Sequence, residues 1–457
     1  MGDPGSVPRV TLWAVFLAAL ALRWAYVVIL FAVMGEDGLK GADSIGYIEQ
    51  ARDFAAAIVA GKVSGWDWLT PNTTTMPLFM WLITLNALLF GTLAPLAYVL
   101  MQGALDAVTC LLVYGIASSF DRAYAMPAAI AAVVNPTQIV LSALFYTDTP
   151  FVFFAALTLW GSVRWLRAPA WRWAVVIGIG LGAAALCRIL IVPAALVLLP
   201  YLAVAALCAG RFRLQQVAQL AGAAAILALC VGPVLTRNVV EYGSWSLTSQ
   251  SGVHFALWVV PFVKEAKDGT PWVKTHEELK QRVEERFGPP SANPFVMSDR
   301  YQELRREELA KLGTGAIAKA WLFGAAVNLG APAIVTSPLV SALPRTGFYA
   351  TQGGSLLEKI TNFLFRSDNA LFAWILIGGI VGVVAVRLLQ LVGLFELLLR
   401  RDVLAMSLLL IGWCGYILVV NGPIAAPKYR LPMEPALAVL TGAGFWRLRQ
   451  VLTKRGE

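Results

Sequence analysis

Long apolar stretches separated by short polar connections run through most of this chain of 457 residues. The first covers residues 10–34, more than the roughly 20 residues that cross a bilayer. Repetition of such stretches predicts an all-α polytopic membrane protein with about 10–12 transmembrane helices. The ten stretches predicted to span are 10–34, 95–118, 124–146, 150–166, 173–188, 190–210, 215–236, 371–393, 402–420 and 432–449.

Lysine and arginine predict which connections face the cytoplasm, because basic residues are enriched on that side. With ten spans, the basic connections all fall on one side and both termini are cytoplasmic. The apolar segment 77–90 is then an interfacial or re-entrant helix, because one more crossing would invert the pattern. Segment 314–345 must cross twice or not at all, and its prolines leave both possibilities open. The basic connections hold Arg122, Arg164, Arg167, Arg172, Arg211, Arg213, Arg400, Arg401 and the C-terminal tail.

Two larger regions, 35–94 and 237–370, are therefore predicted to lie outside the cytoplasm. They suggest a division into an N-terminal transmembrane module (1–236), a large outer loop (237–370) and C-terminal helices (371–457). Within the loop, the charged segments 275–287 and 298–312 have the mixed charges of surface helices.

Composition narrows the possible functions. The chain is 58% hydrophobic and 14% charged, with a net charge of +9. The basic residues sit in short connections, as membrane topology requires, which argues against nucleic-acid binding. Five cysteines lie in apolar segments and two histidines form no cluster with them, so the sequence indicates neither a disulfide framework nor a divalent metal site.

Polar residues at the predicted outer ends of the helices are the candidates for chemistry. Arg188 lies in a tight turn between two apolar helices, where an arginine needs a partner or water. It is either functional or an interfacial anchor whose head reaches the lipid headgroups. Because arginine binds phosphate oxygens bidentately, several such cations together fit a lipid phosphate. We single out Asp43 and Asp148 as catalytic, and Tyr47, Tyr146, Arg188, Arg237, Lys428, Tyr429 and Arg430 as substrate-binding.

Asp43 has two interpretations. It precedes a segment whose apolar residues share one helical face, so it could be the N-cap of an interfacial helix. It also lies on the same side as several cations, where a carboxylate could activate an acceptor hydroxyl. Spacing alone favours the cap. Asp148 has a similar alternative in the turn before Thr149-Pro150.

The order of these motifs resembles that of the GT-C class of membrane glycosyltransferases, especially the bacterial family 39-like enzymes related to aminoarabinose transferases and protein mannosyltransferases. The matching pieces are GADSIGYIEQA, MPLFMWLITLNALLFG, FYTDTPF, ALCRILIVPAAL, LTRNVVEYGSW and KYRLPMEP. They extend over most of the chain. One departure is Met76-Pro77, where aminoarabinose transferases carry a lysine before the proline.

The resemblance implies inverting transfer of a sugar from a polyprenyl-phosphate donor, on the outer face of a bacterial inner membrane, to a lipid, glycan or protein acceptor. Asp43 would be the general base and Asp148 the second family acid. Arg430, with Arg188 and Arg237, would hold the lipid phosphate. Other possibilities are a transporter or flippase of a lipid-linked substrate, an enzyme that uses lipid diphosphate carriers, and a non-catalytic subunit in which Asp43 only caps its helix.

Overall fold

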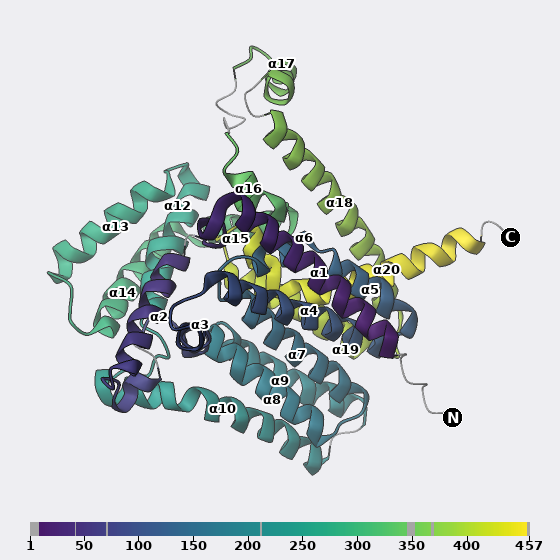
Figure 1. Cartoon of the computed structure of the whole chain (residues 1–457), viewed down its shortest axis with the longest axis horizontal. Coiled ribbons are helices and arrows are strands. Elements are labelled where there is room, and N and C mark those ends of the chain that lie inside the picture. Colours follow the sequence, from purple (N-terminus) through teal and green to yellow (C-terminus); the bar gives the residue numbers. More distant parts are fainter. Residues whose placement is uncertain are drawn as a thin grey trace.

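A computed structural model describes residues 9–41, 43–69, 72–210, 213–344, 352–366 and 370–454, and within these ranges the chain forms helices and no strand (Figure 1). Each predicted span lies in a helix or a broken helix. The helices concerned are α1 (Arg9–Met34), α4 (Pro95–Phe120), α5 (Arg122–Val133), α6 (Pro136–Ser142), α7 (Asp148–Arg167), α8 (Trp171–Cys187), α9 (Ile191–Cys208), α10 (Leu214–Tyr242), α18 (Ala370–Leu399), α19 (Leu404–Asn421) and α20 (Glu434–Lys454).

Six of these helices, α1, α4, α9, α10, α18 and α19, are long and apolar enough to cross a membrane, so the protein is multi-pass. Helices α5 and α6 add a seventh if they form one span bent by 47°. The bend falls at Asn135-Pro136, because the proline lacks the amide that would continue α5. Helix α8 is shorter, with 17 residues. Helices α7 and α20 are long enough, with 20 and 21 residues, but do not meet the combined limits on hydropathy and charge. Helix α7 is packed between α4 and α8, so its surface meets helices rather than lipid.

The interfacial prediction for residues 77–90 agrees with α3 (Pro77–Phe90). Its 14 residues extend about 21 Å, short of the ~30 Å hydrocarbon core. It packs against α2 (Ser44–Val59) and α8. Segment 314–345 contains one long helix, α15 (Thr314–Gly330), followed by η4 (Ala333–Thr336) and α16 (Pro338–Ser341), which are both too short to span. The residues described are therefore not a helical hairpin.

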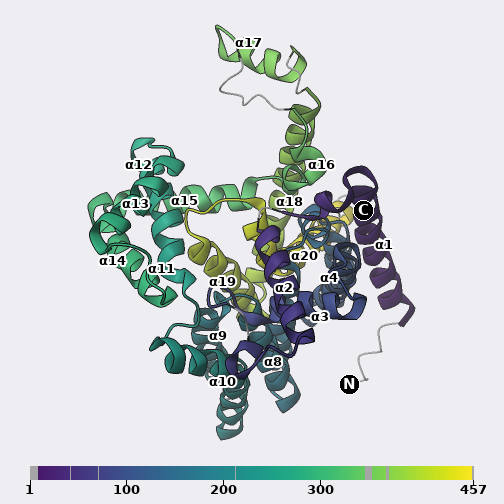
Figure 2. The same cartoon turned by 60° about the vertical axis from the view of Figure 1, so that its left-hand side comes forward.

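Residues 250–312, part of the predicted outer loop, form their own helical group at one side of the bundle (Figures 1 and 2). It contains α11 (Gln250–His254), η3 (Phe255–Val259), α12 (Val260–Asp268), α13 (Trp272–Phe287) and α14 (Pro294–Leu312). Both charged surface helices are confirmed as α13 and α14. They are joined by ion pairs such as Arg282–Glu308 at 2.8 Å. Helix α18 leans away from the bundle and carries α17 (Leu356–Thr361) at its outer end.

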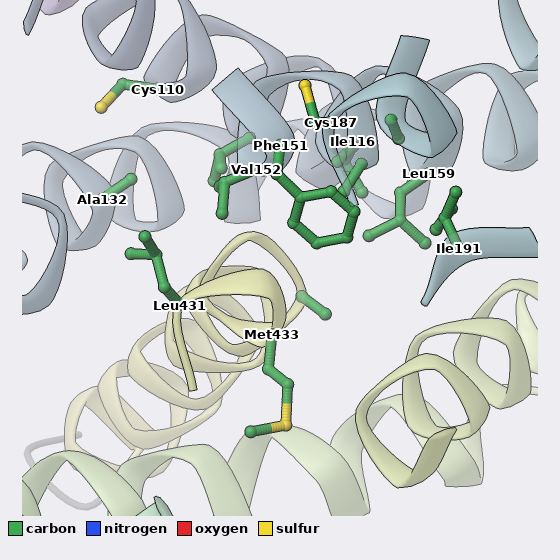
Figure 3. Close-up of a cluster of buried hydrophobic side chains, with 14 of the residues drawn as sticks. Cys110, Ile116, Ala132, Phe151, Val152, Leu159, Cys187, Ile191, Leu431 and Met433 are labelled. Carbon is green, nitrogen blue, oxygen red and sulfur yellow. The ribbon is translucent and has the colours of Figure 1, made fainter. Parts of the chain in front are cut away.

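An ion pair and an apolar cluster hold the centre of the bundle together. Arg23 of α1 donates to Asp106 of α4 at 2.8 Å and to the Val133 carbonyl, which ends α5, at 2.6 Å. Nearby, the segment η7 (Pro427–Met433) lies on the bundle through Leu431 and Met433. Figure 3 shows these two side chains in a buried cluster with residues of α4, α5, α7 and α8.

Candidate active site

Four connections between distant parts of the chain meet at the candidate site. Asp43 precedes α2, Asp148 begins α7, Arg188 follows α8 and Lys428 lies in η7. Prolines define two of these connections. Pro150 falls in the first turn of α7, where a missing amide is tolerated, and Pro427 and Pro432 fix the short helical turn of η7.

Asp43 forms an ion pair with Lys428, 385 residues away in sequence. The Lys428 Nζ donates to the Asp43 Oδ2 at 3.0 Å, and the Asp43 side chain is 56% exposed. The same Nζ lies 5.2 Å from the ring centre of Tyr146 and 5.3 Å from that of Tyr429, within the range of cation–π attraction. Asp43 makes no capping hydrogen bond to α2. Asp43 therefore occupies the N-cap position of α2 without capping it through its side chain, and the exposed carboxylate is available for another role.

The backbone around Asp43 is held by its neighbours. The Ser44 hydroxyl donates to the Phe145 carbonyl at 2.9 Å and accepts from the Gly41 amide at 2.7 Å. Gly41 is needed because a Cβ there would lie 1.8 Å from the Tyr146 hydroxyl oxygen. The start of α2 is thus bound to the turn that carries Tyr146 and Asp148.

Asp148 and Arg188 form a second ion pair. The Arg188 Nη1 donates to the Asp148 Oδ1 at 2.5 Å, and the Asp148 side chain is buried. The Arg188 guanidinium also lies 6.0 Å from the ring centre of Phe151, one turn along α7. Asp148 therefore orients Arg188. With Asp43 and Lys428, the site holds two acids and two cations.

The charges at the site act on one another. Burial lowers the pKa of Lys428, but Tyr429, Asp148 and Asp43 outweigh this effect and raise it well above its ordinary value. Lys428 is therefore a permanent cation at physiological pH. Burial raises the pKa of Tyr47, which also interacts electrostatically with Arg188 and both acids. Tyr47 packs edge-on against Phe79 of α3, with ring centres 5.0 Å apart.

His254, at the end of α11, is a residue that the sequence analysis missed. Burial lowers its pKa, and the positive charges of Arg188 and Lys428 lower it further. The imidazole is therefore neutral at pH 7 and interacts with the same two cations. In the sequence it follows the LTRNVVEYGSW motif by nine residues, but no local pattern indicated this position.

Arg237 and Arg430 both bind acceptors within the protein. Arg237 donates to the Asn238 side chain at 3.0 Å and to the Asn72 carbonyl at 3.4 Å, joining the first outer region to α10. The Arg430 side chain is 3% exposed. Its guanidinium is engaged by protein acceptors, and its role as a phosphate ligand stays a prediction. The acceptors are the Glu434 carboxylate at 2.6 Å, the Asn328 and Ala331 carbonyls at 3.0 and 2.9 Å, and the Thr137 hydroxyl at 2.9 Å.

Among the described residues, no three His, Cys, Asp or Glu side chains gather as metal ligands would. The charged side chains of the site form the two ion pairs, with tyrosine rings near them.

Comparison with known proteins identifies the fold. Residues 72–236 match the family model described as dolichyl-phosphate-mannose-protein mannosyltransferase. The oligosaccharyltransferase AglB of Archaeoglobus fulgidus, solved with an inhibitory peptide and a dolichol-phosphate, superposes with a TM-score of 0.53 at 15% identity. The chain has the GT-C fold. The superposition covers 97% of this chain and 52% of AglB, so the GT-C chain described here spans about half the length of that enzyme.

Two further solved structures align with the chain. The apo Archaeoglobus fulgidus oligosaccharyltransferase gives a TM-score of 0.51 at 15% identity, over 96% of this chain and 52% of that one. ArnT from Cupriavidus metallidurans gives 0.38 at 15% identity, over 96% and 78%, a likeness too weak to support an argument. No curated protein matches the sequence. The family match contains Asp148 and Arg188, whereas Asp43 and Lys428 lie outside it.

Proposed function

We propose that this GT-C chain is a membrane glycosyltransferase that transfers a sugar, with inversion, from a polyprenyl-phosphate donor to an acceptor hydroxyl on the extracytoplasmic face. The observation that supports this most is the exposed Asp43 carboxylate paired with Lys428. A carboxylate can accept the hydroxyl proton, and a neighbouring ammonium can hold the phosphate that leaves.

The Asp43–Lys428 pair suggests how donor binding prepares the base. A phosphodiester that reaches Lys428 competes with Asp43 for the same ammonium group. Because the pair is partly exposed, water can compensate for its opening at small cost. Donor binding would thus release a carboxylate oxygen of Asp43 to accept a hydrogen bond from the acceptor hydroxyl.

In the reaction, the acceptor oxygen attacks the anomeric carbon while the bond from that carbon to the phosphate oxygen breaks. The bonding electrons leave with the lipid phosphate, and the acceptor proton passes to Asp43. Lys428 and Arg188 stabilise the negative charge on the leaving phosphate. Asp148 acts by positioning Arg188. The rings of Tyr47, Tyr146 and Tyr429 are the surfaces on which a sugar could pack.

The distribution of basic residues supports the proposed extracytoplasmic location. Arg164 and Arg167 end α7 at the opposite end from Asp148, and Arg400 follows α18 at the end away from the outer loop. With those ends cytoplasmic, the candidate site faces outward. The acceptor can then be a lipid, a glycan or a protein.

The test is donor turnover by the purified full chain in lipid. A panel of polyprenyl-phosphate sugars and acceptors is offered, and release of the lipid phosphate is followed by mass spectrometry. Asp43→Asn should lower release about 10²–10⁴-fold, the usual contribution of a general base. The matched control is Asp53→Asn, another exposed acid of α2. Equal release by Asp43→Asn and the native chain would remove Asp43 from the mechanism, and no release with any donor would favour the transporter.

A further inference from the structure

Three arginines lie at the turn between α7 and α8, at the end of α7 that is farthest from the candidate active site. Helix α7 ends with Arg164 and Arg167 in its last turn, and α8 begins with Trp171, Arg172 and Trp173. The two helices pack side by side, and Arg164 interacts electrostatically with both other arginines. We call Arg164, Arg167 and Arg172 the arginine cluster.

The indole ring of Trp173 supports two members of the cluster. The guanidinium carbon of Arg164 lies 4.9 Å from the ring centre and that of Arg172 lies 5.0 Å from it, within the range of cation–π attraction. Trp173 is buried, and Trp160 of α7 packs edge-on against it with ring centres 5.0 Å apart. The ring is therefore a fixed platform, which keeps the two guanidinium groups within about 10 Å of each other.

The protein supplies no countercharge to Arg164 or Arg172. In the part of the chain that the structure describes, neither side chain pairs with an acid or donates a hydrogen bond. Residues 149–236 contain six arginines and no aspartate, glutamate or lysine, so the helices around the cluster have no acid of their own to offer. An arginine near membrane depth needs a partner or water. The N–H groups of both arginines are thus available to an anion from outside the chain.

Arg400, at another connection on the same predicted side of the membrane, has different surroundings. It follows α18 and forms ion pairs with Asp121 at 2.9 Å and with Asp402 at 2.8 Å. Asp402 also interacts electrostatically with Arg167, but it already accepts two hydrogen bonds from Arg400. An arginine with two acid partners joins parts of the fold. Arg164 and Arg172 have none, which favours a ligand over a structural role.

Two features of α8 indicate that the cluster lies at the membrane surface. Trp171 is exposed, and a Cβ at Gly222 of α10 would lie 2.8 Å from its ring, so the ring lies against α10. Tryptophan is enriched at membrane–water interfaces. Val175 and Ile179, one and two turns further along α8, are also exposed and share the face of Trp171. A lipid with its headgroup at the cluster therefore has an apolar helix surface for its chains.

We propose that the arginine cluster is a binding site for an anionic phospholipid, whose phosphate accepts hydrogen bonds from Arg164 and Arg172 beside Trp173. Arginine binds phosphate oxygens bidentately, and basic pockets between helix ends on the cytoplasmic side bind anionic headgroups. A zwitterionic headgroup brings a cation of its own, which the three arginines repel. The site is about 24 Å along α7 from Asp148, so it is independent of the proposed function.

Native mass spectrometry of the full chain in detergent tests the proposal by counting retained molecules of phosphatidylglycerol. The double variant Arg164→Gln/Arg172→Gln should retain one molecule fewer than the native chain and bind that molecule about 100-fold more weakly, because two charge-assisted contacts are lost. It should keep the native unfolding midpoint in lipid-free detergent, since no acid loses its partner. The matched control is Arg401→Gln, which removes an exposed arginine on the same predicted side and should retain the native number.

A second double variant separates a built site from general positive charge. Arg164→Lys/Arg172→Lys keeps both charges but loses the guanidinium forks, so it should bind the same lipid about 10-fold more weakly. It also carries the test if the glutamine variant proves unstable. Native affinity in the lysine variant would overturn the proposal, because any cation would then suffice. Equal numbers retained by the native chain and the glutamine variant would overturn it as well.

Two further arms identify the source of the phosphate. With phosphatidylcholine, the native chain and the glutamine variant should retain equal numbers, because the site rejects a zwitterionic headgroup. One molecule more on the native chain would overturn the choice of an anionic lipid. Inorganic phosphate at the concentration of the phosphatidylglycerol should not displace the lipid, whose chains add apolar contacts. Displacement would identify free phosphate as the ligand and overturn the lipid site.

Discussion

The pairs Asp43–Lys428 and Glu434–Arg430 each join one carboxylate to one cation of η7. Their surroundings differ. The Asp43 side chain is 56% exposed and has one ammonium partner. Glu434 is buried, and besides Arg430 it accepts from Asn135 at 2.8 Å and from Thr137 at 3.2 Å. A half-exposed pair can exchange partners with a ligand, whereas a buried network with its donors and acceptors satisfied cannot do so cheaply. On this difference we propose a chemical role for the Asp43–Lys428 pair and a structural role for the Glu434–Arg430 pair.

The largest expected effect is a loss of stability on removal of the buried cation Arg430. It tests whether the Glu434–Arg430 pair is structural. Arg430→Met leaves the Glu434 carboxylate buried without its charge partner, which should destabilise the fold by roughly 3–5 kcal/mol. Thermal unfolding in detergent should show a clear drop in midpoint. Asp43→Asn should keep the native midpoint and lose turnover. If Arg430→Met instead unfolds like the native chain but fails to bind donor, Arg430 is a phosphate ligand after all and the comparison is wrong.

Sequence patterns predicted the helices well, because apolar periodicity and proline positions are local signals. The charged surface helices and the break at Asn135-Pro136 are of this kind. The roles of Arg188, Arg237 and Arg430 could not be separated in the same way, since all three stand near helix ends and differ only in their tertiary partners. His254 needed the fold to bring it within electrostatic reach of Lys428.

A smaller effect is expected at the cation of the exposed pair. Lys428→Gln keeps much of the side-chain length but removes the charge, so donor binding at the candidate site should weaken about 10–100-fold. The measurement is the dependence of phosphate release on donor concentration. Lys40→Gln is the matched control, because Lys40 pairs with Asp37 at 2.8 Å near the start of the same outer region. Equal losses in the two variants would indicate a general effect of surface charge.

The smallest effect concerns His254, whose pKa in the folded chain lies below its ordinary value because of burial and the charges of Arg188 and Lys428. Above pH ~6.5, the usual histidine pKa, both the folded and unfolded chains hold it neutral. As the pH falls below that value, the unfolded chain takes up a proton before the folded chain does. Stability is therefore fully present above pH ~6.5 and is lost as the pH falls through the lower pKa of the folded state.

His254→Gln should remove this part of the pH dependence, since glutamine does not titrate. As the pH falls below ~6.5, the unfolding midpoint of the native chain should fall more steeply than that of the variant. Arg188 and Lys428 should be the cause, so His254→Gln in the Lys428→Gln background should change the slope less than it does in the native chain. If the slopes match in every background, His254 does not interact with the two cations, and its place beside the exposed pair must be reconsidered.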